Sequence, residues 1–209
     1  MTPLAPLLAD HALIELGRCA LTQNADGLAG TLVMVGPDEP AFWPQFAQSS
    51  EMLDGAPNPM DRWSRRVLMD LAESTGSSAI FPFGGPPFQP FFTWAIRTGR
   101  FWSSPIGFLV HDTAGLFVSF RGALLFDDLP FGSPSPQRPC DTCAGQPCKT
   151  ACPVDAFADG YDVAACKAYL RSSPGADCMT RGCLARRACP VSQNPRLPEQ
   201  AAFHMKAFL

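Results

Sequence analysis

Cysteine is the residue type in this chain whose number and spacing could do chemistry. Eight of the nine cysteines fall within 50 consecutive residues. Their order is Cys140-x2-Cys143-x4-Cys148-x3-Cys152-Pro153, then Cys166, then Cys178-x4-Cys183-x5-Cys189-Pro190. Thiolates grouped this closely bind zinc or iron–sulfur clusters, whereas in secreted chains they pair as disulfides.

The spacing separates these three interpretations. Disulfides are disfavoured because Met1–Leu8 lacks the basic start of a secretory signal. Zinc knuckles usually need two Cys-x2-Cys pairs about 15–20 residues apart. Here the only tight pair is Cys140 and Cys143. Iron–sulfur ligation is the favoured interpretation, and the other two stay open.

The two Cys-Pro steps strengthen this interpretation. The run resembles that of bacterial two-cluster ferredoxins, C-x2-C-x2-C-x3-C-P, in which three cysteines hold one cluster and the fourth holds the other. The gaps differ from that pattern: the first group has x4 where x2 is usual, and the second group has x4 and x5. We expect the extra residues to form loops between the ligands.

A second resemblance covers residues 105–191. The segment Ala165-Cys166-Lys-Ala-Tyr-Leu170, the segment Gly107-Phe-Leu-Val-His111 and the lead-in Arg121-Gly-Ala-Leu-Leu-Phe-Asp-Asp-Leu-Pro130 resemble the iron–sulfur module of epoxyqueuosine reductase and of corrinoid-dependent reductive dehalogenases. The resemblance implies a nitroreductase-like α/β sheet domain that holds a corrinoid, followed by two 4Fe–4S clusters. It also implies two crossed ligand sets. The first is Cys140, Cys143, Cys148 and Cys189, and the second is Cys152, Cys166, Cys178 and Cys183.

One departure from that family concerns catalysis. Epoxyqueuosine reductase has an acid that donates a proton just upstream, whereas the corresponding stretch here, Phe81-Pro-Phe-Gly-Gly-Pro86, contains none. Reduction of epoxyqueuosine is therefore not expected. Gly84 and Gly85 would still let the backbone approach a flat cofactor, a corrinoid or a flavin, and Gly85→Val would block that approach. A stiff turn is the alternative for this stretch.

Charge and composition limit the partners. The net charge of −3 does not favour a general nucleic-acid binder. From Arg138 to Arg196, eight Lys/Arg face five Asp/Glu, a local +3. A basic shell suits a cluster with four thiolates, which carries a charge of about −2, although a solvated surface is equally consistent. We expect no membrane span and a cytoplasmic location, with a redox protein as partner.

The surrounding elements follow from periodicity and turn residues. We expect a helix over 4–21 that buries Cys19, a strand over Thr31–Val35, a short helix over Pro40–Gln48, a helix from Pro59 to about Ser74, a helix over Pro90–Thr98, a hairpin of Ile106–His111 with Leu116–Phe120, and a strand over Ala123–Phe126. His111 should be exposed at the turn, and Arg62, Arg65 and Arg66 should face solvent or an anion.

The expected fold class is α+β. It comprises an α/β domain over 1–130, a linker over 131–139, a ferredoxin-like module over 140–196 and a tail over 197–209. The expected function is electron transfer through two 4Fe–4S clusters, as a carrier or as a component of a reductase. The alternative is a corrinoid- or flavin-dependent reductase whose clusters feed the cofactor.

Overall fold

The computed structural model describes residues 3–132, 136–192 and 196–209. The chain divides into two compact units. Unit 1 is Met1–Arg100 with Ser119–Ser135, and unit 2 is Phe101–Val118 with Pro136–Leu209. Both contain helices and short antiparallel strands, so the predicted α+β class is confirmed.

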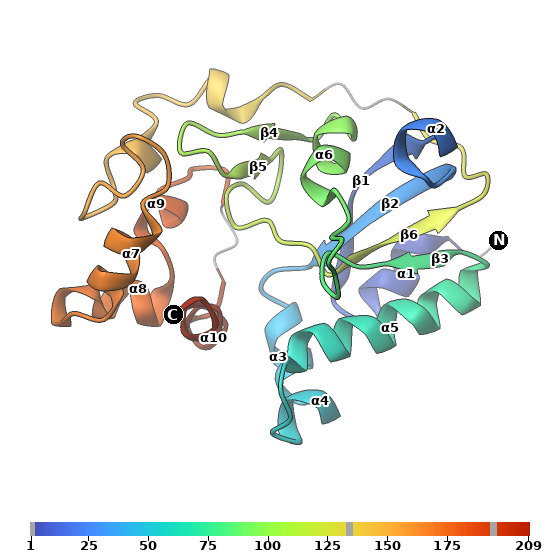
Figure 1. Cartoon of the computed structure of the whole chain (residues 1–209), viewed down its shortest axis with the longest axis horizontal. Coiled ribbons are helices and arrows are strands. Elements are labelled where there is room, and N and C mark those ends of the chain that lie inside the picture. The colour runs from blue at the N-terminus through green and yellow to red at the C-terminus, as the bar shows by residue number, and fades with distance from the viewer. Residues whose placement is uncertain (1–2, 133–135, 193–195) are drawn as a thin grey trace. The chain divides into compact units, whose positions relative to one another are not determined.

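Figure 1 labels the helices and strands along the chain. In unit 1 they are α1 (Leu4–Ala9), β1 (Leu13–Leu21), α2 (Gln23–Asp26), β2 (Gly30–Pro37), α3 (Phe42–Ala47), α4 (Ser50–Leu53), α5 (Pro59–Thr75), β3 (Ser78–Ile80), α6 (Phe91–Arg97) and β6 (Gly122–Phe126). In unit 2 they are β4 (Phe101–Ser103), β5 (Leu109–His111), α7 (Val163–Leu170), α8 (Ala176–Arg181), α9 (Leu184–Arg187) and α10 (Pro198–Phe208), with short 3₁₀ turns at Pro139–Asp141, Pro147–Lys149 and Ser173–Gly175.

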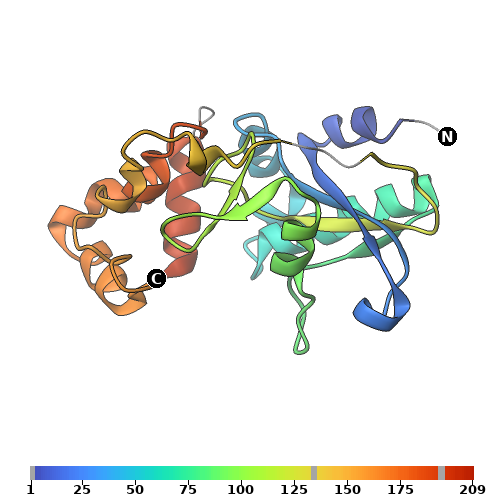
Figure 2. The same ribbon diagram turned by 90° about the horizontal axis from the view of Figure 1, so that it is seen from above.

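Unit 1 is built on a four-stranded antiparallel sheet in the order β1-β2-β6-β3, which Figure 2 shows from above. Strand β2 contains the predicted run Thr31–Val35, and its side chains are buried on both faces. Helices α1 and α6 pack against β1, and α5 packs against β3 and β6. This covering explains why β2 is an uninterrupted apolar run, and the prediction of a buried strand here is confirmed.

Helix α5 also agrees with the sequence. It begins at Pro59 after Asn58 and ends at Gly76, whose φ of 67° terminates the helix. Its inward face buries Trp63, Val67, Leu68 and Leu71, as the helical spacing predicts. Shortening a side chain so fully buried, as in Leu68→Ala, typically costs about 2–5 kcal/mol.

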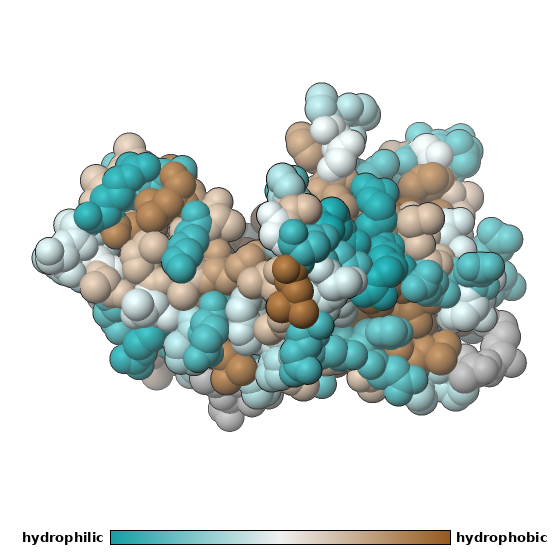
Figure 3. All heavy atoms as spheres, turned by 90° about the horizontal axis from the view of Figure 1, so that it is seen from below, coloured by the Kyte–Doolittle hydropathy of each residue, from teal (hydrophilic) through white to brown (hydrophobic). Residues whose placement is uncertain are grey.

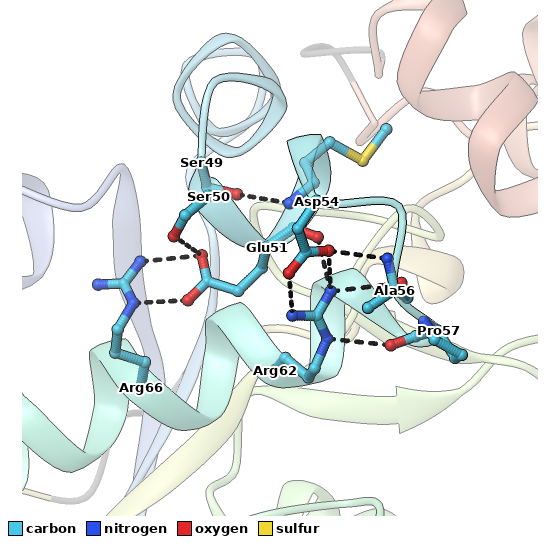
Figure 4. Close-up of polar contacts among 9 residues, drawn as sticks. Ser49, Ser50, Glu51, Asp54, Ala56, Pro57, Arg62 and Arg66 are labelled. Atoms are coloured by element: carbon cyan, nitrogen blue, oxygen red, sulfur yellow. Dashed lines mark hydrogen bonds and ion pairs between the residues drawn. The ribbon is translucent and has the colours of Figure 1, made fainter.

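Two arginines of α5, Arg62 and Arg66, form ion pairs with carboxylates at α4. Arg62 binds Asp54 through both terminal nitrogens at 2.7 Å, and Arg66 binds Glu51 at 2.6 and 3.1 Å, as Figure 4 shows. Glu51 is only 7 % exposed, and its bond to Arg66 lowers the pKa of its carboxyl to about 2. These pairs fix α4 to α5. Arg65 instead lies over two aromatic rings of the loop after β3.

The predicted helix over 4–21 is wrong beyond Ala9. The helix ends there, and Leu13–Leu21 forms β1, paired with β2. A β-bulge between Glu15 and Gly17 explains the error. Because of the bulge, Leu13 and Leu16 are both buried, and their spacing of three residues resembles helical periodicity rather than the alternation of a regular strand. Cys19 lies on β1 and is buried, as predicted.

The predicted hairpin has a different partner strand. β5 pairs with β4, and only a single bridge joins His111 to Gly115. Residues 116–118 form no strand, because their polar backbone atoms bind the cysteine-rich segment instead. Arg186 donates to the carbonyl oxygen of Leu116 at 2.6 Å, and Arg196 donates to that of Phe117 at 2.9 Å.

The prediction of an exposed His111 is also wrong. The side chain is 1 % exposed, and its ring lies 4.6 Å from that of Phe101. Its Nδ1 accepts hydrogen bonds from the backbone N–H groups of Thr113 and Ala114. The turn therefore closes around the imidazole rather than presenting it to solvent.

The compact units differ from the division expected at 131–139. Residues 101–118 belong to unit 2, since Ile106, Val110 and Leu116 share one core with Cys148 and Ala185. Part of the expected linker, 133–135, lies outside the described residues. The segment expected to be a tail contains helix α10, which packs against α8.

Hydrophobic side chains reach the surface in separate patches among hydrophilic ones on the face drawn in Figure 3. The most exposed large ones are Leu53, Phe88, Met69 and Phe92. Among the residues that the structure describes, no helix combines the length and apolarity needed to cross a membrane.

Candidate metal centre

The first predicted ligand set lines a single pocket in unit 2. Cys140 and Cys148 lie in 3₁₀ turns, Cys143 lies between them, and Cys189 follows α9. All four border one small pocket, of about 20 Å³. The structure therefore brings Cys189, from the second cysteine group, to the same place as the three cysteines of the first group.

The long gap between Cys143 and Cys148 is accommodated by a turn. Gly145 and Gln146 both have left-handed backbones, with φ of 70° and 41°. The side-chain amide of Gln146 donates to the carbonyl oxygen of Cys140 at 3.5 Å, a long contact. The turn returns the chain so that Cys148 faces the pocket. The two extra residues therefore do not keep Cys148 from the pocket that the other three cysteines line.

The rest of the pocket wall is apolar. It includes Val110 and Leu116 from the segment 101–118, together with Val191 and several prolines. Burial raises the pKa of the Cys148 thiol, and neighbouring Cys140, Cys189 and Cys143 raise it further. Burial likewise raises the pKa of Cys140, while Arg138 opposes the shift. Several thiolates without a cation would repel one another here, so the site suits a cationic metal centre.

Segment 101–118 is fixed to this pocket at Gly115. The Ser192 hydroxyl accepts a hydrogen bond from the backbone N–H of Leu116 at 2.9 Å. A Cβ on Gly115 would lie 2.7 Å from the Ser192 nitrogen, so only glycine fits, and its φ of 59° also favours glycine. Residues 110 and 116 therefore reach the pocket through a tight contact that sequence reasoning missed.

The second predicted set comes from four segments of unit 2, and some of its members act on one another electrostatically. Cys152 follows a 3₁₀ turn, Cys166 lies on α7, Cys178 lies on α8 and Cys183 precedes α9. Burial raises the pKa of the Cys178 thiol most, and the charge of Cys183 adds to it. Burial also raises the pKa of the Cys183 thiol, and the charge of Cys152 adds to this rise. Cys166, Cys183 and Cys152 all raise the pKa of the nearby Tyr161 hydroxyl, although burial is the largest cause of that rise.

Backbone N–H groups act on sulfurs of this second set. The N–H of Ala156 donates to the Cys152 sulfur at 3.4 Å. The backbone N–H groups of Arg186 and Ala185 lower the pKa of the Cys183 thiol, and that of Leu184 lowers the pKa of Cys178, each against the larger raising effect of burial. N–H groups directed at sulfur stabilise the thiolate form and set the potential of a bound cluster.

Part of the expected basic shell also adjoins the thiols. The Arg138 charge lowers the pKa of Cys140, Arg186 that of Cys183 and Arg187 that of Cys178, each against the larger raising effect of burial. Arg187 is also paired with Asp177. The arginines thus place positive charge around sulfurs that would be anionic in a cluster.

The donor set fits iron–sulfur clusters by its chemistry. Four of the eight cysteine sulfurs line one pocket with apolar walls, and a backbone N–H donates to a fifth, that of Cys152. Within the described residues, no three His, Cys, Asp or Glu side chains are grouped so as to hold a single metal ion. A cube of eight atoms is larger than one ion, and its four thiolates stand further apart. That the eight cysteines are ligands stays a prediction.

Gly84 and Gly85 lie in unit 1, at an open pocket of about 430 Å³ that Phe81 and Phe83 also line. A Cβ on Gly84 would lie 3.4 Å from the Arg65 guanidinium. One on Gly85 would lie 2.7 Å from the carbonyl group of Pro87. Gly85 is therefore required by its own loop, and Gly85→Val would disturb that loop whether or not a ligand binds.

Comparison with known proteins returned no relative: no family model, no curated protein and no solved structure matches this chain.

Proposed function

We propose that this protein transfers electrons through two 4Fe–4S clusters, as a carrier or as the iron–sulfur component of a reductase. The observation that carries the proposal is the convergence of Cys140, Cys143, Cys148 and Cys189 on one pocket, although Cys189 lies 41 residues beyond Cys148. Such convergence is the arrangement that a four-thiolate cluster requires.

Each residue type has a role in this proposal. Cys140, Cys143, Cys148 and Cys189 would hold one cluster, and Cys152, Cys166, Cys178 and Cys183 the other. A bound 4Fe–4S cluster supplies reversible one-electron chemistry. Val110 and Leu116 would form part of an apolar wall beside the first cluster, and the N–H of Ala156 would stabilise negative charge on the Cys152 sulfur.

The test is chemical analysis of protein purified without oxygen. Eight ligands in two sets predict about eight iron and eight acid-labile sulfide per chain. A Cys19→Ala variant, which alters the one cysteine outside the motif, should retain that content. Stoichiometric zinc without sulfide would overturn the proposal, and about four iron would show that only one set holds a cluster.

The second candidate function is a corrinoid- or flavin-dependent reductase. It draws on the open pocket of about 430 Å³ beside Gly84 and Gly85, whose volume falls within the range of about 300–1,000 Å³ that is common for ligand pockets. Phe81 and Phe83 supply aromatic faces, and the guanidinium carbon of Arg65 lies 4.8 and 5.5 Å from their ring centres.

Titration with cobalamin and with flavin tests this candidate. Spectral changes that Phe83→Ala weakens, and that Phe88→Ala does not, would support it. Phe88 is the matched control because it is 65 % exposed and belongs to the same loop. If neither ligand perturbs the spectrum, the carrier function stands alone. A redox partner protein is required in either case.

A further inference from the structure

Ser104 carries a buried hydroxyl that has no hydrogen-bond partner among the residues that the structure describes. The residue is only 6 % exposed, and within the described part of the chain its hydroxyl oxygen neither donates nor accepts a hydrogen bond. Most buried hydroxyl groups form at least one hydrogen bond, because burying a polar group without a partner destabilises the fold. The surroundings of this hydroxyl should therefore explain why it is buried.

The backbone of Ser104 is fixed by the turn that joins β4 to β5. Its N–H donates to the carbonyl oxygen of Phe108 at 2.8 Å, and its carbonyl oxygen accepts the N–H of Gly107 at 3.0 Å. Both polar groups of its main chain are therefore paired within the turn. The turn holds the residue in place, and the side-chain hydroxyl is the group that Ser104 offers to its surroundings.

Those surroundings are the pocket of the first cysteine set. Ser104 lines this pocket together with all four cysteines of that set, and the remaining wall consists mostly of prolines and aliphatic residues. The other polar residue of the wall is Gln146, whose side-chain amide donates to the carbonyl oxygen of Cys140. Apart from that amide, the side-chain acceptors that the described wall presents to the Ser104 hydroxyl are sulfur atoms.

We propose that the Ser104 hydroxyl donates a hydrogen bond to a sulfur of the first cluster and thereby raises the reduction potential of that cluster. This inference rests on the proposed function. Reduction adds one electron, which the redox partner supplies, and the sulfurs carry part of the added negative charge. A hydrogen bond strengthens as the charge on its acceptor grows, so this bond favours the reduced form. The hydroxyl keeps its proton, and no covalent bond changes.

The experiment compares Ser104→Ala with Ser103→Ala in the cluster-loaded full chain. Midpoint potentials are measured by redox titration with dithionite, followed by electron paramagnetic resonance. Ser104→Ala removes only the buried hydroxyl. We expect it to disfavour reduction of the first cluster by about tenfold, which lowers the potential by about 59 mV for one electron. Ser103 is the matched control, because it is the preceding residue, on β4, and is exposed. Ser103→Ala should leave both potentials unchanged.

The possible outcomes are distinguishable. A lowered potential confined to Ser104→Ala, in the signal that Cys140→Ala abolishes, supports the inference. An unchanged or raised potential in Ser104→Ala, or equal shifts in both serine variants, would overturn the tuning role and leave two-cluster electron transfer intact. The same holds for a shift in the signal that Cys152→Ala abolishes, and for loss of iron from Ser104→Ala, which would mean that Ser104 holds the site together. Wild-type protein without iron and sulfide would overturn the proposed function, and this inference with it.

Discussion

The crossed arrangement of ligands can be tested with pairs of Cys→Ala substitutions. In the structure Cys140 and Cys189 line the same pocket, whereas Cys152, assigned to the second set, lies near enough to its fellow member Cys183 to act on it electrostatically. If these are the two ligand sets, Cys140→Ala with Cys189→Ala damages one cluster twice. Cys140→Ala with Cys152→Ala damages both clusters. The sequence order alone would suggest the reverse, because Cys152 follows Cys148 closely.

The expected iron content of each variant follows from the number of four-iron clusters that it can still hold. The Cys140/Cys189 double variant should retain about four iron per chain, and the Cys140/Cys152 double variant close to none. The cysteines are replaced by alanine rather than serine, because the serine side chain can still bind iron as an alkoxide. Iron and sulfide analysis, with electron paramagnetic resonance of the reduced protein, provides the assay. If the Cys140/Cys152 variant keeps half its iron while the Cys140/Cys189 variant loses all of it, the crossed assignment is refuted.

Three further predictions concern the surrounding structure. Glu51→Gln should lower the free energy of unfolding by about 1–2 kcal/mol at pH 7, because it breaks the ion pair with Arg66. Asp54→Asn, which breaks the more exposed pair with Arg62, should lower it by less. Chemical denaturation measures both free energies. Since its pKa is lowered from 4.5 to about 2, the Glu51 contribution is complete above about pH 4.5 and disappears as the pH falls toward 2. Gly115→Val should reduce iron content through its clash with the cysteine-rich segment, whereas Gly107→Val, also left-handed but in open space, should retain it. Cys19, buried with a pKa raised to about 11, should resist alkylation at pH 8 in native protein, as read by mass spectrometry.

The sequence predicted best the elements whose local signals agree with their packing. Asn58-Pro59 and Gly76 bound a helix with a clear apolar face, and the run at 31–35 is apolar because β2 is covered on both faces. The grouping of eight cysteines was likewise visible as a pattern. In each case the nearby residues alone carry the information.

Predictions were wrong where distant contacts decide the outcome. The bulge before Gly17 gives β1 a helix-like spacing, which only pairing with β2 corrects. The burial of His111 depends on Phe101 and on a turn that closes over the ring.

Electron uptake tests the central claim most directly. Protein purified without oxygen is titrated with a calibrated reductant while its visible absorbance is followed. Two 4Fe–4S clusters predict the reversible uptake of about two electrons per chain, with partial bleaching of a broad sulfur-to-iron absorption. A colourless protein that takes up no electrons, with its thiols free or bound to zinc, would contradict the account.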